Sequence, residues 1–425
     1  MAAIGRGTVA RFSVWLVLAL CAVRSLAAED ESRLAPDSRY GFVEASGGVR
    51  TQDDDHQSRD LLLGELRYQE DLTWYLPDSE LQLTADVYAD GVTERVLLDL
   101  RKLSLSVYRW DVAEVKAGVQ VSTWGTGDYL FINDLFPKDW QSFFIGRDDE
   151  YLKAPAPSVR VTVFPEAFDV DFVWTPFFEP DRYVTGDRLS YWSPLTQSRT
   201  GESLDADQPP NTLAKGEFAL RLSKNVSGTE WAAYGYRGFW PRPEGYDLDR
   251  REAVHPHLLV GGASVRRALA GGIANAEFGY YESPDDRRGD DPLTPNSEVR
   301  ALVGFKHELA RELTGAVQWY VEHMLNYSEY ERAVPAHDYM RDRDRHVLTL
   351  RLTKLMMSQN LMLSLFGFYS PTDGDAYVRP SLSYKWSDHL SSAVGGNWFV
   401  GEDEHTFFGQ MADNSNVYAR VRYSF

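Results

Sequence analysis

The chain has little cysteine and little positive charge. Its single cysteine, Cys21, lies in an apolar stretch near the N-terminus. If this stretch is removed as a leader, disulfides, cysteine-ligated zinc, iron–sulfur clusters and thiol catalysis are excluded. There are 44 Lys and Arg against 63 Asp and Glu, a formal charge of −19. This balance argues against a general nucleic-acid-binding protein, because such affinity comes from neutralising phosphates.

Long apolar runs are also missing. Beyond residue 28 no run of 18 apolar residues occurs, which excludes a helical membrane protein. A β-barrel is still allowed, because its strands face lipid only at every second residue. Aromatic residues make up 13% of the chain, too many for an acidic disordered protein.

The N-terminus predicts export. Arg6 and Arg11 are followed by an apolar stretch at 12–23 and by small residues up to Ala28. This order is typical of a secretory signal peptide, cleaved near Ala28, and the apolar part is too short for a membrane anchor. We therefore expect a signal peptide at 1–28 and a large, acidic, exported protein of a Gram-negative envelope.

The last nine residues, VYARVRYSF, alternate strictly. Val417, Val421 and Phe425 share one parity, while Arg420 and Arg422 share the other, so the two sets lie on opposite faces of a strand. This strand resembles the closing strand of bacterial outer-membrane barrels. The resemblance implies an outer-membrane location, and recognition by the barrel-assembly machinery through the terminal Phe425.

The same period of two recurs along the chain and predicts an all-β fold, a transmembrane antiparallel barrel over 39–425. Short turns alternate with long outer loops, and 29–38 is expected to be a short periplasmic tail. Sixteen strands are the alternative to eighteen. The eighteen segments are 40–50, 60–75, 80–90, 96–109, 113–122, 157–165, 167–176, 213–223, 229–240, 257–267, 271–282, 297–308, 313–324, 345–354, 360–369, 376–386, 390–400 and 416–425.

The polar parity of these strands is rich in arginine. If the apolar parity faces lipid, this set lines the lumen and favours anions there. The alternative is that these arginines pair with acidic residues of the wall and of inward-folded loops. The predicted lumen-facing set is Arg160, Arg221, Arg237, Arg300, Arg351, Arg379, Arg420 and Arg422.

One connecting segment, at about 123–156, is too aromatic for an exposed loop of its length. Its glycines and prolines allow and stiffen an irregular path. We expect it to fold inward and to narrow or plug the pore; an outer cap over the barrel mouth is the alternative. The predicted constriction residues are Trp124, Asp128, Tyr129, Asp134, Lys138, Asp139 and Arg147.

This segment resembles a largely uncharacterised family of Gram-negative porin-like outer-membrane proteins. The family has a Trp-Gly box, an Asn-Pro-x-Asp-like turn and a Pro-x-Pro motif before the next strand. Here these are Trp124-Gly125, Phe136-Pro137-Lys138-Asp139 and Pro155-Ala156-Pro157, with Phe136 in place of Asn. More distantly, the chain looks like barrels that export alginate or other anionic polysaccharides.

Histidine patterns give no convincing catalytic or metal site. His255-Pro256-His257 lacks a third ligand at a recognisable spacing. His337-Asp338 lacks the paired carboxylates of barrel proteases, and no His-x-Ser-Asn string supports a phospholipase. We predict no catalytic, cofactor-binding or metal-binding residues and no cofactor.

The sequence thus predicts a porin-like channel that passes small polar or anionic solutes by passive diffusion. The alternative is a barrel sleeve of an export or multi-protein conduit, for an anionic polysaccharide or a redox partner. An outer-membrane hydrolase is a third, less favoured reading. Expected partners are outer-membrane lipid and lipopolysaccharide, with a homotrimer or a periplasmic partner left open and no nucleic acid.

Overall fold

The protein is a closed barrel of eighteen antiparallel strands. A computed structural model describes residues 35–335 and 339–425. The last strand, β23 (Asn416–Ser424), pairs with the first, β1 (Ser38–Arg50), and so closes the sheet. The count confirms eighteen strands over the sixteen-strand alternative. The predicted leader at 1–28 lies outside the described residues, as does most of the predicted tail.

Each strand pairs with its neighbours in chain order. Between β1 and β23 the barrel strands are β2 (Leu61–Leu76), β3 (Ser79–Asp90), β4 (Arg95–Trp110), β5 (Ala113–Gln120), β6 (Ala156–Val163), β7 (Asp169–Thr175), β11 (Glu217–Val226), β12 (Thr229–Phe239), β15 (His257–Leu269), β16 (Gly272–Glu282), β17 (Glu298–Ala310), β18 (Leu313–Met324), β19 (Asp344–Met356), β20 (Leu361–Ser370), β21 (Asp375–Lys385) and β22 (Leu390–Val400).

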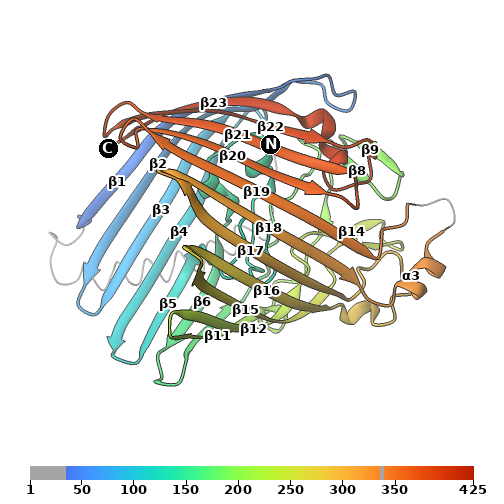
Figure 1. Cartoon of the computed structure of the whole chain (residues 1–425), viewed down its shortest axis with the longest axis horizontal. Helices are drawn as coiled ribbons and strands as arrows, with labels where there is room; N and C mark the ends of the chain where they lie inside the picture. The colour runs from blue at the N-terminus through green and yellow to red at the C-terminus, as the bar shows by residue number, and fades with distance from the viewer. Residues whose placement is uncertain (1–34, 336–338) are drawn as a thin grey trace.

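The two ends of the barrel differ. Most turns of two to five residues gather at one end with the C-terminus (Figure 1). The long connections gather at the other end, together with the loop 51–60 and the short turns 91–94 and 371–374. The long connections are 121–155, 176–216, 240–256, 283–297, 325–343 and 401–415. They hold the short elements α2 (Trp140–Ile145), η2 (Asp149–Leu152), β8 (Tyr191–Ser193), β9 (Ser198–Thr200), β10 (Ala206–Asp207), η3 (Leu213–Lys215), β13 (Gly245–Asp247), β14 (Glu252–Val254), η4 (Pro284–Asp286), α3 (Tyr327–Ala333) and η5 (Gly409–Asn414).

The wall is apolar outside and polar inside. On β2, Leu66 and Tyr68 are 58% and 38% exposed, whereas Glu65 and Arg67, which alternate with them, are 5% and 3% exposed. Such alternation places lipid-compatible side chains outward and charged ones in the lumen, as in transmembrane barrels. Among the described residues, no helix has the length and apolar character needed to cross a membrane.

The C-terminal residue, Phe425, bonds to the first strand, β1, and packs on its outer face. Phe425 exchanges two backbone hydrogen bonds with Gly41, at 3.0 and 3.2 Å. Its ring stacks on Tyr68 with centroids 6.0 Å apart. A Cβ atom at Gly41 would lie 2.8 Å from the Phe425 ring and 2.4 Å from the carbonyl oxygen of Gln69. Only glycine at position 41 therefore leaves room for the Phe425 ring where β1 and β23 close the barrel.

We predict that Gly41→Ala destabilises the barrel by about 1–3 kcal/mol, the usual cost of overpacking. The measurement is the temperature at which the folded, fast-migrating band is lost on a gel. Gly47→Ala, on the same strand, is the matched control, because a Cβ atom at position 47 would have no other atom within 4 Å. Equal midpoint temperatures for the two variants would contradict the conclusion that Gly41 makes room for the Phe425 ring.

Candidate functional site

The segment 121–155 runs through the lumen rather than over the barrel mouth. Its backbone N–H groups bond inward-facing residues of β16 and β18, and its side chains bond residues of β2 and β23 on other parts of the wall. Of its residues, Ile132, Phe143 and Ile145 are almost fully buried. The lumen is therefore crossed by chain that the wall holds at several points.

The first attachment is the carboxylate of Glu277 on β16. It accepts hydrogen bonds from the backbone N–H groups of Thr126 and Asn133, at 2.7 and 2.8 Å. The hydroxyl of Thr126 and the amide of Asn133 each donate a further bond at 3.0 Å. Gly125 has a positive φ of 78° and lies against this carboxylate, where a Cβ atom would be 2.9 Å from it. The Trp-Gly pair thus passes directly over a buried acid.

The predicted constriction residues at the start of the segment lie against the wall. Trp124 packs edge-on against Phe136, with ring centroids 5.0 Å apart. Asp128 forms an ion pair of 3.0 Å with Arg351 of β19. That guanidinium also lies 4.3 Å from the ring centroid of Tyr129. This group brings aromatic and charged side chains to one side of the lumen.

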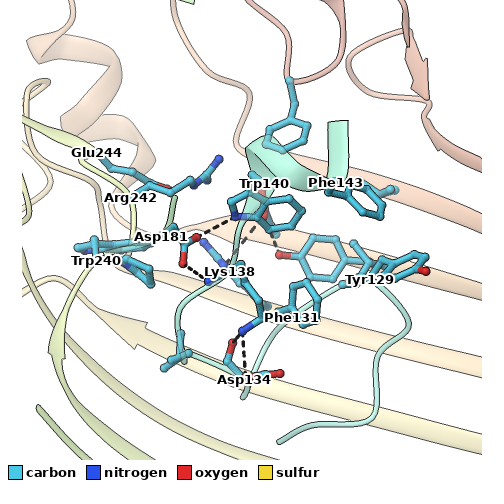
Figure 2. Close-up of a pocket in the computed structure, with 18 of the residues that line it drawn as sticks. Tyr129, Phe131, Asp134, Lys138, Trp140, Phe143, Asp181, Trp240, Arg242 and Glu244 are labelled. Atoms are coloured by element: carbon cyan, nitrogen blue, oxygen red, sulfur yellow. Dashed lines mark hydrogen bonds and ion pairs between the residues drawn. The ribbon is translucent and has the colours of Figure 1, made fainter. Parts of the chain in front are cut away.

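The turn 136–139 is buried at the centre of the segment. The Lys138 ammonium bonds the Asp134 carboxylate at 3.0 Å, and the Lys138 backbone N–H donates to Asp181 at 2.8 Å (Figure 2). Burial raises the pKa of Asp181, while the charge of Lys138 opposes this rise. Asp139 caps the six-residue helix α2 by accepting from the N–H of Ser142 at 2.7 Å. This helix was not predicted from the sequence.

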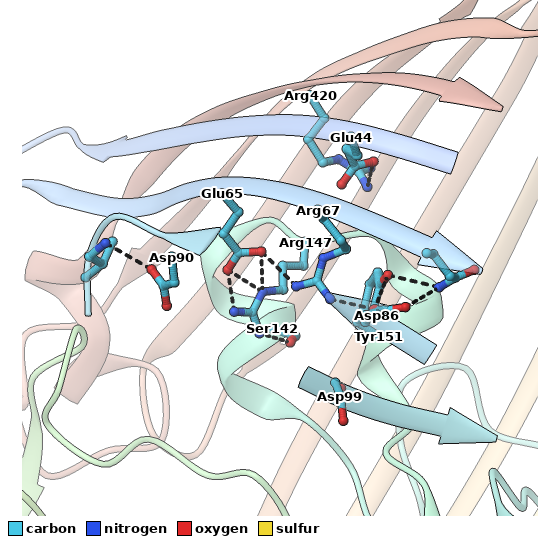
Figure 3. Close-up of polar contacts among 12 residues, drawn as sticks. Glu44, Glu65, Arg67, Asp86, Asp90, Asp99, Ser142, Arg147, Tyr151 and Arg420 are labelled. Atoms are coloured by element: carbon cyan, nitrogen blue, oxygen red, sulfur yellow. Dashed lines mark hydrogen bonds and ion pairs between the residues drawn. The ribbon is translucent and has the colours of Figure 1, made fainter. Parts of the chain in front are cut away.

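After the helix, Arg147 enters the most buried ion-pair network. Its Nε donates to Glu65 of β2 at 3.0 Å, and its Nη1 donates to the hydroxyl of Ser142 at 2.8 Å (Figure 3). Arg67 bonds the same Glu65 at 2.8 Å and Asp86 at 2.6 Å. Because two arginines share the wall acids, each buried charge has a partner of opposite sign.

Three successive acids then face three wall arginines. Asp148 pairs with Arg420 at 2.7 Å, Asp149 pairs with Arg379, and Glu150 pairs with Arg422 at 3.0 Å. Although burial would raise the pKa of Asp148, Arg420 and Arg422 hold that pKa below its usual value. The stabilising contribution of Asp148 is therefore present above about pH 4 and is lost as the pH falls through the lowered pKa.

Burial has the opposite net effect on Glu150. It raises the pKa of that carboxyl despite the nearby charge of Arg422. Within the acidic run 148–150, the pKa of Asp148 is thus lowered and the pKa of Glu150 is raised.

Three of the remaining predicted lumen arginines also have acidic partners. Arg160 bonds Asp171 through its Nε at 3.0 Å. Arg221 lies 3.6 Å from the same Asp171, and Arg300 lies 4.0 Å from Glu322. The wall therefore follows the paired alternative rather than presenting free positive charge.

Arg237 does not lie where the sequence predicted. On β12, Ala232 and Tyr234 share the inward parity, whereas Arg237 shares the outward parity of Trp231. Its paired residue on β11 is Phe218, which is also on the outward parity. Because Ala232 and Tyr234 supply the inward parity of β12, the alternation of apolar and polar residues on this strand does not show which face lines the lumen.

A cavity of about 140 Å³ lies between the segment and the wall (Figure 2). Aromatic rings make up much of its surface, with Arg242, Arg300 and Arg345 opposed by Glu244 and Glu322. The aromatic lining consists of Tyr129, Phe131, Phe136, Trp140, Phe143, Phe144, Trp240, Tyr281, Tyr320, Phe368, Phe407 and Phe408. Of the wall members, Arg300 belongs to the predicted lumen set, whereas the loop members Trp240, Arg242 and Phe407 were not predicted.

Solved structures resemble this barrel over nearly its whole length. Acinetobacter baumannii OccAB3 matches with a TM-score of 0.53 and 11% identity, over 91% of this chain and 98% of that one. Pseudomonas aeruginosa OccK2 (OpdF), solved with glucuronate, matches with a TM-score of 0.53 and 9% identity, over 91% and 97%. The fold is that of outer-membrane porins. Pseudomonas aeruginosa OccD3 (OpdP) matches with a TM-score of 0.51 and 10% identity, over 92% and 91%.

No family model matches the chain, and no curated protein matches its sequence. The resemblance to the family with the Trp-Gly box therefore stays a prediction. The porin-like barrel fold does not depend on it.

We predict that Arg147→Ala loosens the segment from β2, because it leaves Glu65 with only Arg67 as a partner. Breaking a buried pair costs about 3–5 kcal/mol. The measurement is the rate of limited proteolysis within 121–155 on folded protein. Arg250→Ala is the control, since its pair with Asp207 is exposed and contributes about 1 kcal/mol or less. Unchanged cleavage in Arg147→Ala would refute this anchoring.

Proposed function

We propose that the protein is an outer-membrane porin-like channel that passes small polar or anionic solutes by passive diffusion. The observation that carries the proposal is partial exposure of charged side chains inside the barrel. The side chains of Arg351 on the wall and Asp128 on the segment 121–155 are 29% and 32% exposed although both lie in the lumen. An interior filled by protein would bury such a pair, whereas a water-containing lumen leaves it partly hydrated.

The segment 121–155 is proposed to form the constriction. It brings Asp128, Tyr129 and Asp149 to the same region of the lumen, where Tyr129 donates a hydrogen bond to Asp149. Field lines concentrate in a narrow pore with low-dielectric walls, so a few fixed charges there govern which ions pass. The mechanism needs neither a cofactor nor a catalytic residue.

The wider setting follows from the same proposal. The outward apolar face lies in lipid, lipopolysaccharide surrounds the end with the long loops, and the barrel-assembly machinery recognises Phe425. A homotrimer and a periplasmic partner are both compatible with the barrel. A sleeve for an anionic polysaccharide or a redox partner is the competing function, and conductance separates the two.

Refolded protein in a planar bilayer under a salt gradient is predicted to give stable openings. Deletion of 128–150 is predicted to increase the conductance, because it removes the chain that crosses the lumen. Folding of the variant is checked by its heat-dependent gel migration. Folded protein with no conductance before or after the deletion would refute the free-diffusion channel and favour the sleeve.

The acidic run is predicted to set ion preference. Replacing Asp148, Asp149 and Glu150 with Asn, Asn and Gln leaves Arg379, Arg420 and Arg422 without these partners, so the reversal potential should shift toward anion selectivity. The matched control replaces three exposed outer-loop acids, Asp53, Asp55 and Glu402, with their amides. Equal shifts in both triple variants would contradict a local role for the run.

A further inference from the structure

Arg237 is a cation on the outside of the barrel with no carboxylate partner. Within residues 35–335 and 339–425, its guanidinium makes no hydrogen bond or ion pair, and its side chain is exposed. An unpaired arginine on the lipid-facing wall costs about 2–4 kcal/mol at the bilayer midplane and about 0–1 near the interface. Its position along the strand therefore decides what it can do.

Arg237 lies near the outer edge of the wall. Strand β12 has eleven residues, Thr229–Phe239, and Arg237 is the third from the end that leads into a long loop. At about 3.3 Å per residue and a tilt of about 40°, the strand spans roughly the 25 Å height of an apolar barrel belt. Arg237 thus lies where lipid headgroups begin, rather than among acyl chains.

Two further basic side chains share this site. His257, the first residue of β15, has the outward parity opposite to buried Leu258, and its Nε2 lies 3.2 Å from the Nζ of Lys215. The residue directly across from Arg237 on β15 is Leu259, so His257 is a diagonal neighbour, about 7–8 Å away. Lys215, Arg237 and His257 therefore fall within the reach of one phosphorylated headgroup.

The charges around this cluster leave room for an anion. Asp285 is the one acid that contacts it in the described part of the chain, and its Oδ2 accepts from the backbone N–H of His257 at 2.7 Å. Both Asp285 oxygens also lie 3.1 Å from the His257 Nδ1. This holds the ring with Nδ1–H toward Asp285 and Nε2 toward Lys215. The ammonium of Lys215 and the guanidinium of Arg237 keep donors free for an acceptor from outside the protein.

We propose that Lys215 and Arg237, with His257 positioning the Lys215 ammonium, form a binding site for a phosphate group of the lipopolysaccharide in the outer leaflet. Arginine binds phosphate oxygens through two parallel hydrogen bonds, and lysine adds a point charge. The ring of Phe218, which is paired with Arg237 across the sheet and shares its outward parity, lies beside the cluster where acyl chains would pack against the wall. The His257 ring packs against buried Phe239, with centroids 4.8 Å apart. The site is independent of whether the lumen conducts.

The test uses full-length protein extracted from outer membranes in mild detergent. Native mass spectrometry and a sugar assay give the lipopolysaccharide retained per barrel for wild type and for Lys215→Ala/Arg237→Ala. Because two near-surface cations are lost, we expect about 30-fold weaker retention on titrating the glycolipid back. Conductance of the same variant should stay unchanged, which separates this proposal from that of the channel.

Arg267→Ala is the matched control. Arg267 is also exposed and of outward parity on β15, but it lies opposite Thr229 at the short-turn end. This control should retain lipopolysaccharide as wild type does, and dephosphorylated lipopolysaccharide should bind as weakly to wild type as to the double variant. Equal retention by the wild type and the double variant would overturn the proposal. Full competition by millimolar inorganic phosphate would also overturn it, since the site would then be one for free phosphate.

Discussion

A closed barrel can hold a long segment inside only if the wall supplies a partner for each charge the segment buries. The segment 121–155 meets this constraint residue by residue. Glu277 accepts four hydrogen bonds from Thr126 and Asn133, and Glu65 pairs with Arg147. Because an unpaired buried charge costs several kcal/mol, these pairings specify the path of the segment far more sharply than its aromatic contacts do.

The same constraint explains why the arginine-rich wall does not have a strongly positive interior. Arg379, Arg420 and Arg422 lie opposite Asp149, Asp148 and Glu150, and so the segment neutralises the strands that hold it. The charge balance of the lumen is thus a joint property of wall and segment. A solute would meet alternating charges over a short distance, which favours selection by shape and local polarity over bulk attraction of anions.

Aromatic side chains pack in the space between the ion pairs of the segment and the wall. Phe143 and Phe144 of α2 lie against Tyr377 of β21, with centroids 5.8 Å apart in each case. The C-cap, Gly146, has a φ of 89° and allows the backbone to approach Tyr418 so closely that a Cβ atom would clash with its ring. The ion pairs therefore determine where the segment attaches to the wall, and the apolar contacts determine how closely it packs against the wall.

The sequence by itself determined the barrel and nearly all strand positions, because a wall between lipid and water imposes a period of two on every strand; it favoured eighteen strands and left sixteen open. It also predicted that the aromatic segment folds inward, since so many rings in one long loop need cover. It placed Arg160, Arg351 and Arg420 in one inward-facing set with Arg237, although Arg237 has the outward parity on β12, where Ala232 and Tyr234 supply the inward one. Only the tertiary structure decided which acid meets which arginine, and that Glu277 holds the Trp-Gly pair. The contacts of Glu277, Asp148, Asp149 and Glu150 join residues more than a hundred positions apart. Their geometry depends on barrel closure, which no local pattern encodes.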